Sequence, residues 1–127
     1  MLNTSRPKPT ERKIMPDNCL FCKIINGNIP ADKLYEDEDL FAFRDIAPQA
    51  PVHFLVIPKK HISGPCAVTP DDDQVMGKLM RVAANIAREQ GIEQYRLVFN
   101  NGEEAGQSVF HIHMHVLGGR NMGWPPG

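Results

Sequence analysis

Apolar residues along this chain recur with two different periods, and each period predicts a different kind of element. Between Thr69 and Gly91 they recur every three or four residues, which predicts one long amphipathic helix. Its buried stripe is expected to comprise Val75, Leu79, Val82 and Ile86. A short helix is expected between a cap at Asn18 and Gly27. Short apolar runs predict strands at 33–36, 40–44, 52–57 and 95–99.

A fifth strand is expected within residues 108–117, where histidines alternate with apolar side chains. In a strand, His111, His113 and His115 project to one face. Ile112, Met114 and Val116 then project to the other. A helix would scatter the same histidines around its axis and leave no coherent apolar stripe. The pattern therefore predicts a strand with one core face and one chemical face.

Strand runs interrupted by one long helix indicate an α+β fold. We expect a five-stranded antiparallel sheet covered on one face, with one long and one short helix. Residues 18–127 form one domain in this interpretation. Residues 1–17 are polar, basic and proline-bearing, which is typical of a flexible tail. Their prolines disfavour an amphipathic organelle-targeting helix.

Composition excludes several classes of partner. A net charge of −1 over 127 residues gives no reason to expect a nucleic acid or an anionic membrane as a standing partner. No apolar run approaches the ~18 residues of a membrane span. Three cysteines, an odd number, are typical of a reducing compartment. We therefore expect a cytoplasmic protein, with a nuclear pool as an alternative.

Three imidazoles on one face either ligate a metal or act on phosphate. The preceding loop, residues 100–108, is rich in glycine, amide and hydroxyl groups and offers backbone N–H donors for an anionic oxygen. A hydrolytic metal site would more often recruit carboxylates beside its histidines, but Glu103 and Glu104 lie in the loop instead. The pattern thus favours phosphate chemistry.

Residues 111–117, His-Ile-His-Met-His-Val-Leu, match the H-φ-H-φ-H-φ-φ motif (φ apolar) of the histidine triad (HIT) superfamily. The run from Asp45 to Ile62 and the ending Leu117–Gly127 resemble the histidine triad nucleotide-binding (Hint) branch in particular. Agreement of three separated segments in the same order, within 18–127, makes the resemblance specific. It implies a homodimer that joins two such sheets.

The resemblance also implies catalytic roles. His113 would be the nucleophile that attacks the α-phosphorus and forms a nucleotidyl-histidine. His115 and the Ser108 hydroxyl would assist the leaving group and bind phosphate oxygens. His111 and His53 would form a second pair that orients the nucleophile and relays charge. From the residues alone, His53 could equally face solvent.

The resemblance assigns further positions to the nucleotide. Asp45 would accept the ribose hydroxyls, although a solvated turn aspartate is the alternative. Trp124, in the C-terminal segment, would shape the leaving-group pocket of the partner subunit. The purine slot would be formed by Phe21, Ile24, Phe43 and Ile46. Contacts to the phosphate or leaving group would come from Asn100, Gly106 and Gln107.

Cys19 and Cys22 form a C-x-x-C pair, but no thioredoxin-like βαβ context supports a redox role. In some relatives such cysteines hold a structural zinc, and the ligands here would then be Cys19, Cys22, His53 and His111. Zinc would remove His53 and His111 from the relay, so the two assignments compete. No cofactor is expected to be required for catalysis.

We therefore expect a purine nucleoside phosphoramidase that hydrolyses the P–N bond of adenosine 5′-phosphoramidates, including adenylyl-lysine, to AMP and an amine. The enzymatic alternative is a dinucleoside polyphosphate hydrolase of the Fhit type, which the ending Trp124–Gly127 disfavours. A non-catalytic nucleotide-binding or scaffold protein is an alternative of another class, and a metal-binding module is a third.

Overall fold

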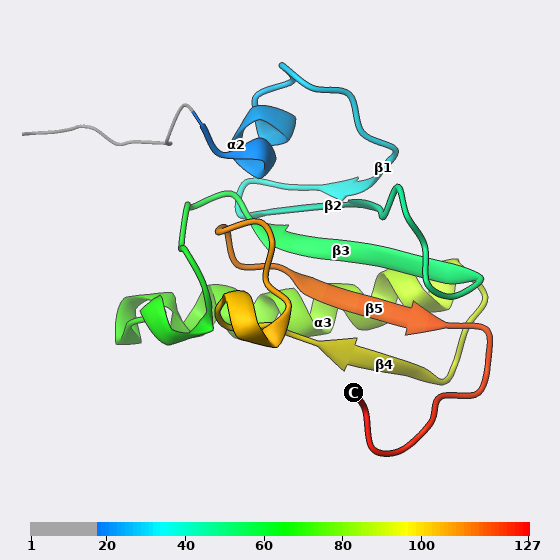
Figure 1. The fold of residues 1–127 in the computed structure, drawn as a ribbon. Helices are drawn as coiled ribbons and strands as arrows, with labels where there is room; N and C mark the ends of the chain where they lie inside the picture. The colour runs from blue at the N-terminus through cyan, green and yellow to red at the C-terminus, as the bar shows by residue number, and fades with distance from the viewer. Residues whose placement is uncertain (1–17) are drawn as a thin grey trace, which may run out of the picture.

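Five antiparallel strands form one sheet, as predicted, and their order is β1-β2-β3-β5-β4 (Figure 1). A computed structural model describes residues 18–127, so the tail expected at 1–17 lies outside the described residues. The strands are β1 (Lys33–Glu36), β2 (Leu40–Arg44), β3 (Val52–Pro58), β4 (Tyr95–Val98) and β5 (Met114–Gly118). The helices are α2 (Leu20–Ile25) and α3 (Asp73–Glu89), with short 3-10 turns η1 (Pro65–Ala67), η2 (Pro70–Asp72) and η3 (Glu103–Ala105).

Helix α3 covers one face of the sheet and forms the main core with it (Figure 1). Its predicted stripe is confirmed, because Leu79, Val82 and Ile86 are buried and Val75 packs at the edge of the same cluster. The strands contribute Leu40, Ala42, Phe54, Val56, Met114 and Val116 to this core. Met114 and Val116, which alternate with the histidines, therefore lie on the core face as expected.

The opposite face of the sheet is covered only in part. Phe41, Phe43, Leu55 and Ile57 pack there against the short helix α2. Leu55 pairs with His115 and His53 with Leu117, and paired residues of antiparallel strands share a face. His53 and His115 therefore lie on this face, beyond the part that α2 covers. The apolar cluster between α2 and the sheet therefore ends beside His53 and His115.

Several element boundaries differ from the predictions. Helix α2 is capped by Cys19, whose Sγ accepts a hydrogen bond from Cys22 N, and not by Asn18. Strand β4 ends at Val98, one residue earlier than expected. Strand β5 begins only at Met114, opposite Val56, although β3 continues to Pro58. Proline has no N–H for the ladder, and the Pro58 carbonyl accepts a hydrogen bond from the His111 ring.

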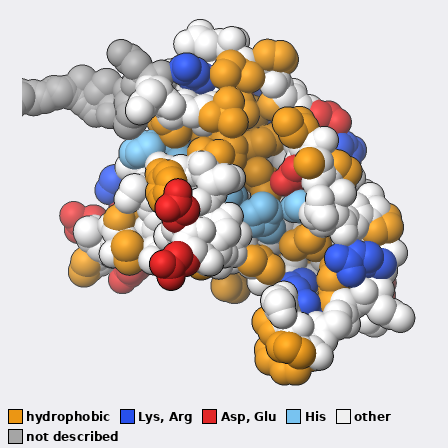
Figure 2. All heavy atoms as spheres, viewed as in Figure 1, with side chains coloured by type: hydrophobic (Ala, Val, Ile, Leu, Met, Phe, Trp, Pro, Cys, Tyr) orange, Lys and Arg blue, Asp and Glu red, His pale blue; other side chains and the backbone are white. Residues whose placement is uncertain are grey.

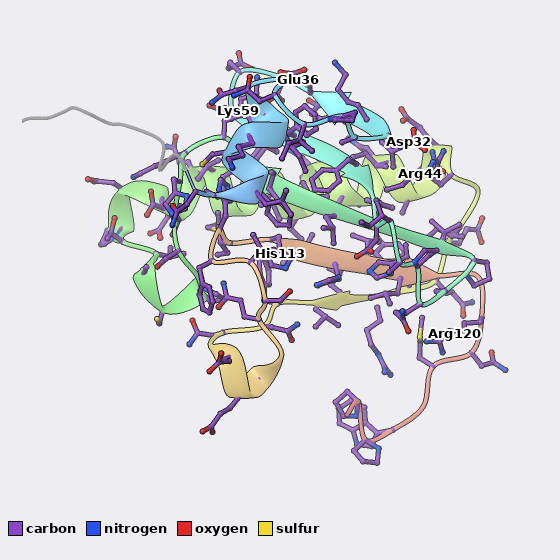
Figure 3. All side chains as sticks on the ribbon, turned by 45° about the horizontal axis from the view of Figure 1, so that its top comes forward. Asp32, Glu36, Arg44, Lys59, His113 and Arg120 are labelled. Carbon is purple, nitrogen blue, oxygen red and sulfur yellow. The ribbon has the colours of Figure 1, made fainter. Side chains whose placement is uncertain are left out.

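Polar contacts fix the ends of the other elements. Asp72, before α3, accepts hydrogen bonds from both N and Oγ1 of Thr69, and Lys60 Nζ lies 2.6 Å from its Oδ1. The sheet edge carries the ion pairs Lys59–Glu36 and Arg44–Asp32, labelled in Figure 3. Within residues 18–127 no helix combines the length and apolar character needed to cross a membrane.

Candidate active site

A cavity of about 390 Å³ opens on the partly covered face, between helix α2 and the loop before β5. Hydrophobic side chains and histidines meet on the same face in Figure 2. The cavity brings together residues, from four segments of the chain, that the sequence had assigned to substrate or catalysis. They are Phe21, Ile24, Phe43, Asp45, Ile46, Asn100, Gly106, Ser108, His113 and His115.

His113 lies directly before β5, on the face opposite helix α3 (Figure 3). Its Nδ1 is 2.8 Å from the carbonyl oxygen of His111. A carbonyl can only accept, so Nδ1 carries the proton and Nε2 keeps its lone pair. Burial lowers the pKa of His113 below its ordinary value, although the His111 carbonyl and Asp45 act in the opposite direction. The ring is therefore neutral at neutral pH and keeps an unprotonated Nε2.

His115 has the opposite tautomer, which a chain of hydrogen bonds determines. The backbone N–H of Gln49 donates to His53 Nδ1 at 3.0 Å, so the proton of His53 is on Nε2. His53 Nε2 then donates to His115 Nδ1 at 2.9 Å. The remaining nitrogen of His115, Nε2, must carry a proton. The cavity thus contains one imidazole lone pair, on His113, beside one imidazole donor, on His115.

The two rings lie close together, with centroids 5.0 Å apart. Burial, His113 and His53 together lower the pKa of His115 to about 4. Burial lowers the pKa of His53 as well, against the nearby carboxylate of Asp45. All three imidazoles are therefore neutral near pH 7, which their hydrogen bonds require.

Asp45, His53 and His115 also place their ligand atoms within 4.8 Å of one another, close enough to share a metal ion. Asp45 Oδ2 lies 3.4 Å from His53 Nε2 and 4.0 Å from His115 Nδ1. A metal ion on His53 Nε2 would require a proton on Nδ1, but Nδ1 faces the Gln49 N–H donor. The Nδ1–H group of His53 and the backbone N–H group of Gln49 would then be two donors that face each other. This arrangement favours proton handling and not metal binding.

The other end of the cavity is apolar. The rings of Phe21 and His113 are perpendicular with centroids 5.0 Å apart, and the Phe43 ring lies 5.5 Å from that of Phe21. Ile46 stands on the rim and is 98% exposed. A flat aromatic ligand would find apolar contact here and polar donors at the histidine end.

Two of the predicted substrate contacts do not lie in this cavity. The side chain of Gln107 is buried, and its amide bonds to Gly102 N, Ser63 O and Val109 O. The prediction that Gln107 contacts the phosphate or leaving group is therefore wrong for the side chain in this chain. Trp124 is 83% exposed and is not part of the cavity wall. Its predicted place at a partner's site stays a prediction.

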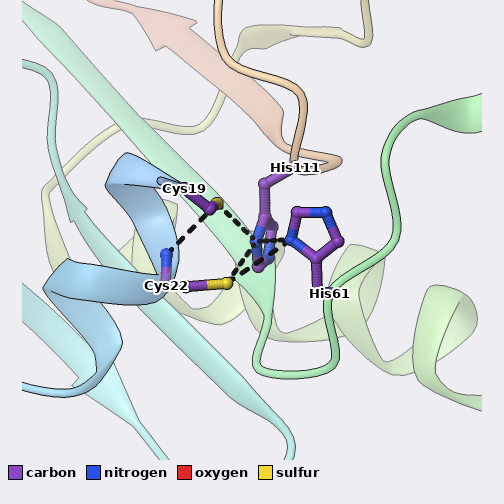
Figure 4. Close-up of side chains that lie close together, drawn as sticks. All are labelled: Cys19, Cys22, His61 and His111. Atoms are coloured by element: carbon purple, nitrogen blue, oxygen red, sulfur yellow. Dashed lines mark hydrogen bonds between the residues drawn. The ribbon is translucent and has the colours of Figure 1, made fainter. Parts of the chain in front are cut away.

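A second cluster, formed by Cys19, Cys22, His61 and His111, lies beside the cavity (Figure 4). His61 Nδ1 and His111 Nδ1 are 3.2 Å apart. Sγ of Cys19 and of Cys22 lie 3.5 and 3.6 Å from His111 Nδ1, and Cys22 Sγ lies 3.4 Å from His61 Nδ1. A tetrahedral zinc with ordinary bond lengths has N–S edges of about 3.6 Å and N–N edges of about 3.3 Å. The cluster matches these edges.

The protonation state of His111 agrees with a role as a ligand. Its Nε2 lies 2.8 Å from the Pro58 carbonyl oxygen, so Nε2 carries the proton and Nδ1 presents a lone pair to the cluster. Histidines that bind metals typically donate their second N–H in this way. Burial and the neighbouring Cys19 raise the pKa of Cys22 to about 12, so a thiolate here requires a cation.

The predicted set of zinc ligands included His53, and this assignment is wrong. Antiparallel pairing puts His53 opposite Leu117 and Val56 opposite Met114. A residue beside His111 must therefore follow the end of β3 at Pro58, and His61 does. For the same reason His53 and His111 do not form a pair, because His53 bonds to His115 instead. The antiparallel register was the signal that could have identified His61.

The chain belongs to the HIT family, because the HIT domain model matches residues 26–122. It is 51% identical over 114 residues to an uncharacterised HIT-like protein of Synechocystis, covering 89% of this chain and all of that protein.

Solved structures agree with this assignment. A HIT family hydrolase from Legionella pneumophila is 52% identical with a TM-score of 0.84, over 87% of this chain and 100% of that chain. A HIT family hydrolase from Clostridium thermocellum is 44% identical with a TM-score of 0.84, over 86% and 96%. A histidine triad protein from Clostridium difficile is 38% identical with a TM-score of 0.83, over 87% and 97%.

Proposed function

We propose that this protein is a purine nucleoside phosphoramidase of the Hint branch, which hydrolyses adenosine 5′-phosphoramidates to AMP and an amine. The complementary tautomers of His113 and His115 carry this proposal. A lone pair and a donor side by side are what displacement of an amine at phosphorus requires. The apolar slot and Asp45 support a nucleoside as the bound group.

In the first step, His113 Nε2 attacks the α-phosphorus, the N–P bond to the ring forms and the P–N bond to the amine breaks. The amine leaves with a proton from His115 or Ser108, both of which line the cavity. The nucleotidylated ring is positively charged, and its Nδ1–H bond to the His111 carbonyl stabilises that charge. Water then attacks phosphorus and gives its proton back to the group that protonated the amine, the N–P bond to His113 breaks, and AMP is released.

Zinc belongs to this proposal as a structural ion, held by Cys19, Cys22, His61 and His111. Four protein ligands leave no open position, so the ion would cross-link α2 to the segment before β5 without touching substrate. Since His53 lies outside this set, zinc no longer competes with the contact between His53 and His115. No external cofactor takes part in the two displacements.

The protein is proposed to act as a homodimer. Strand β4 is an edge strand, and Leu97 within it and Phe99 directly after it are each more than a third exposed. Met80 on α3 is also exposed, and an unpaired edge with apolar neighbours favours pairing with a second copy. Light scattering at micromolar concentration tests this state, and a monomer there contradicts it. Deleting residues 122–127, which include Trp124, should change substrate preference more than stability.

The test of the activity is turnover of an adenosine 5′-phosphoramidate and of a diadenosine polyphosphate, measured side by side with the same preparation. We expect the phosphoramidate to have the higher kcat/KM. Preference for the polyphosphate would support the Fhit-type alternative. AMP binding without turnover of either compound would instead support a nucleotide-binding or scaffold protein.

A further inference from the structure

The loop between β4 and β5 carries residues that point in two directions. Asn100 and Ser108 line the cavity. Their neighbours Asn101 and Gln107 instead reach the segment that follows β3: Asn101 Oδ1 accepts from Cys66 N at 2.9 Å, and Gln107 Nε2 donates to Ser63 O at 2.7 Å. Each cavity residue is therefore adjacent to a residue that anchors the loop.

The Gln107 amide is saturated with hydrogen bonds inside the protein. Its Oε1 accepts from Gly102 N at 2.8 Å, and its Nε2 donates to Val109 O at 3.1 Å as well as to Ser63 O. The side chain is 3% exposed. One carboxamide thus joins both ends of the loop to each other and to the segment at Ser63, and no other side chain of that size offers two donors and an acceptor in this geometry.

Gly64 lies between the two anchoring amides. Its φ of −178° is open to any residue, so the backbone does not require glycine there. A Cβ on Gly64 would lie 3.2 and 3.3 Å from Oε1 and Nε2 of Gln107 and 3.3 Å from Oδ1 of Asn101. Space for the two amides is therefore the reason that glycine fits at this position.

The anchoring segment is itself held in place. Ile112 N donates to Ile62 O at 2.6 Å, directly beside His113. His61, at the start of the segment, belongs to the cysteine–histidine cluster. The loop, the nucleophile and the cluster therefore share one short support, residues 61–64.

We propose that Gln107 and Asn101 are positioning residues that hold the loop bearing Asn100, Gly106 and Ser108 at the phosphate, and that Gly64 provides the space they require. This inference rests on the proposed function and adds to it residues that act without touching substrate. Their loss should affect the phosphate end of the cavity and leave the base and ribose end unchanged.

The experiment compares variants of the full chain by calorimetric binding of adenosine and of AMP, by kcat with the phosphoramidate, and by Tm. Gln107→Glu keeps the shape and the acceptor but lacks both donors. Gly64→Ala displaces both amides by a few tenths of an ångström. Asn101→Ala removes the acceptor for Cys66 N, and Asn101→Asp restores it. Gly77→Ala is the matched control, because a Cβ on Gly77 meets nothing within 4 Å.

We expect kcat to fall about 100-fold in Gln107→Glu and about tenfold in Gly64→Ala, since misplacement by 1 Å costs up to about 100-fold. AMP affinity should fall in both while adenosine affinity stays within about twofold of wild type, since the loop meets only the phosphate. Asn101→Asp should retain activity that Asn101→Ala loses, and Gly77→Ala should match wild type in kcat and in both affinities. Should Gln107→Glu fail to fold, Gly64→Ala and the Asn101 pair provide the same test.

Equal loss of adenosine and AMP affinity, or unchanged kcat in Gly64→Ala and Asn101→Ala, would overturn the inference. Failure of the proposed function looks different, because wild type itself would then not turn over the phosphoramidate. Only the ratios of kcat and of affinity between variant and wild type test the roles of Gln107 and Asn101.

Discussion

His111 and His113 are two residues apart, yet their rings lie in two different clusters. The clusters differ in whether each hydrogen-bond acceptor faces a donor. Around the cavity, each hydrogen-bonded imidazole nitrogen opposes a partner of the other kind: Gln49 N–H with His53, His53 with His115, and His113 with a carbonyl. In the cysteine–histidine cluster, two ring nitrogens and two sulfurs oppose one another.

This difference shows that backbone groups decide what a histidine does. The Pro58 carbonyl turns the lone pair of His111 toward the cysteines, and the His111 carbonyl leaves the lone pair of His113 free for substrate. A row of donors and acceptors can pass a proton, whereas converging lone pairs need a cation. In the proposed function, identical residue types thus form a reactive site and a structural site side by side.

The largest effect is expected at the lone pair of His113. Replacing His113 by asparagine removes the atom that bonds to phosphorus, so kcat should fall by several orders of magnitude, about 10⁴-fold or more. AMP binding, measured by calorimetry, should survive. Mass spectrometry after a rapid acid-free quench should find a nucleoside monophosphate on the His113 peptide of wild type. Ample turnover by the variant, or inversion at a chiral phosphorus, would contradict nucleophilic catalysis.

Much of this arrangement could be predicted from the sequence. The alternation of His113 and His115 with core residues is a local property, and so are the helix stripe and all five strands. The choice between His53 and His61 is not local, because it depends on where β3 ends relative to β5. The buried bonds of Gln107 depend on Ser63, 44 residues away, and no local pattern indicates them.

The second-largest effect is expected at the cysteine–histidine cluster. Purified protein should carry one zinc per chain, and His61→Ala should lose it while His53→Ala keeps it. Chelation should lower Tm by about 10 °C or more, since 1 kcal/mol corresponds to roughly 4 °C in a domain of this size. Hydrolysis per folded molecule should persist. If chelation abolishes activity while the fold persists, and metal restores it, a metallohydrolase replaces the proposed mechanism.

A smaller effect is expected along the chain of hydrogen bonds that runs from Gln49 through His53 to His115. His115→Gln removes the imidazole donor, and His53→Gln removes the group that fixes its tautomer. Each should lower kcat by roughly 10²-fold, the contribution of one positioned proton donor. KM should change little, because neither variant alters the apolar slot. Ser108→Ala serves for comparison, and equal pH profiles for wild type and His53→Gln would argue against a tautomer effect.

The smallest effect is the contribution of His115 to stability at acid pH. Its pKa is about 4 in the folded protein, below the ordinary 6.5, because burial and the nearby His53 and His113 disfavour the charged ring, against Asp45. Between pH 6.5 and 4 the unfolded chain binds the proton and the folded chain does not, so stability rises with pH. This contribution is complete above pH 6.5 and is lost as the pH falls through 4. Calorimetric Tm of zinc-loaded wild type should therefore fall over this range by a few degrees more than that of His115→Gln, about 2–5 °C. Zinc release at low pH affects both proteins alike, so parallel curves would mean that His115 titrates normally.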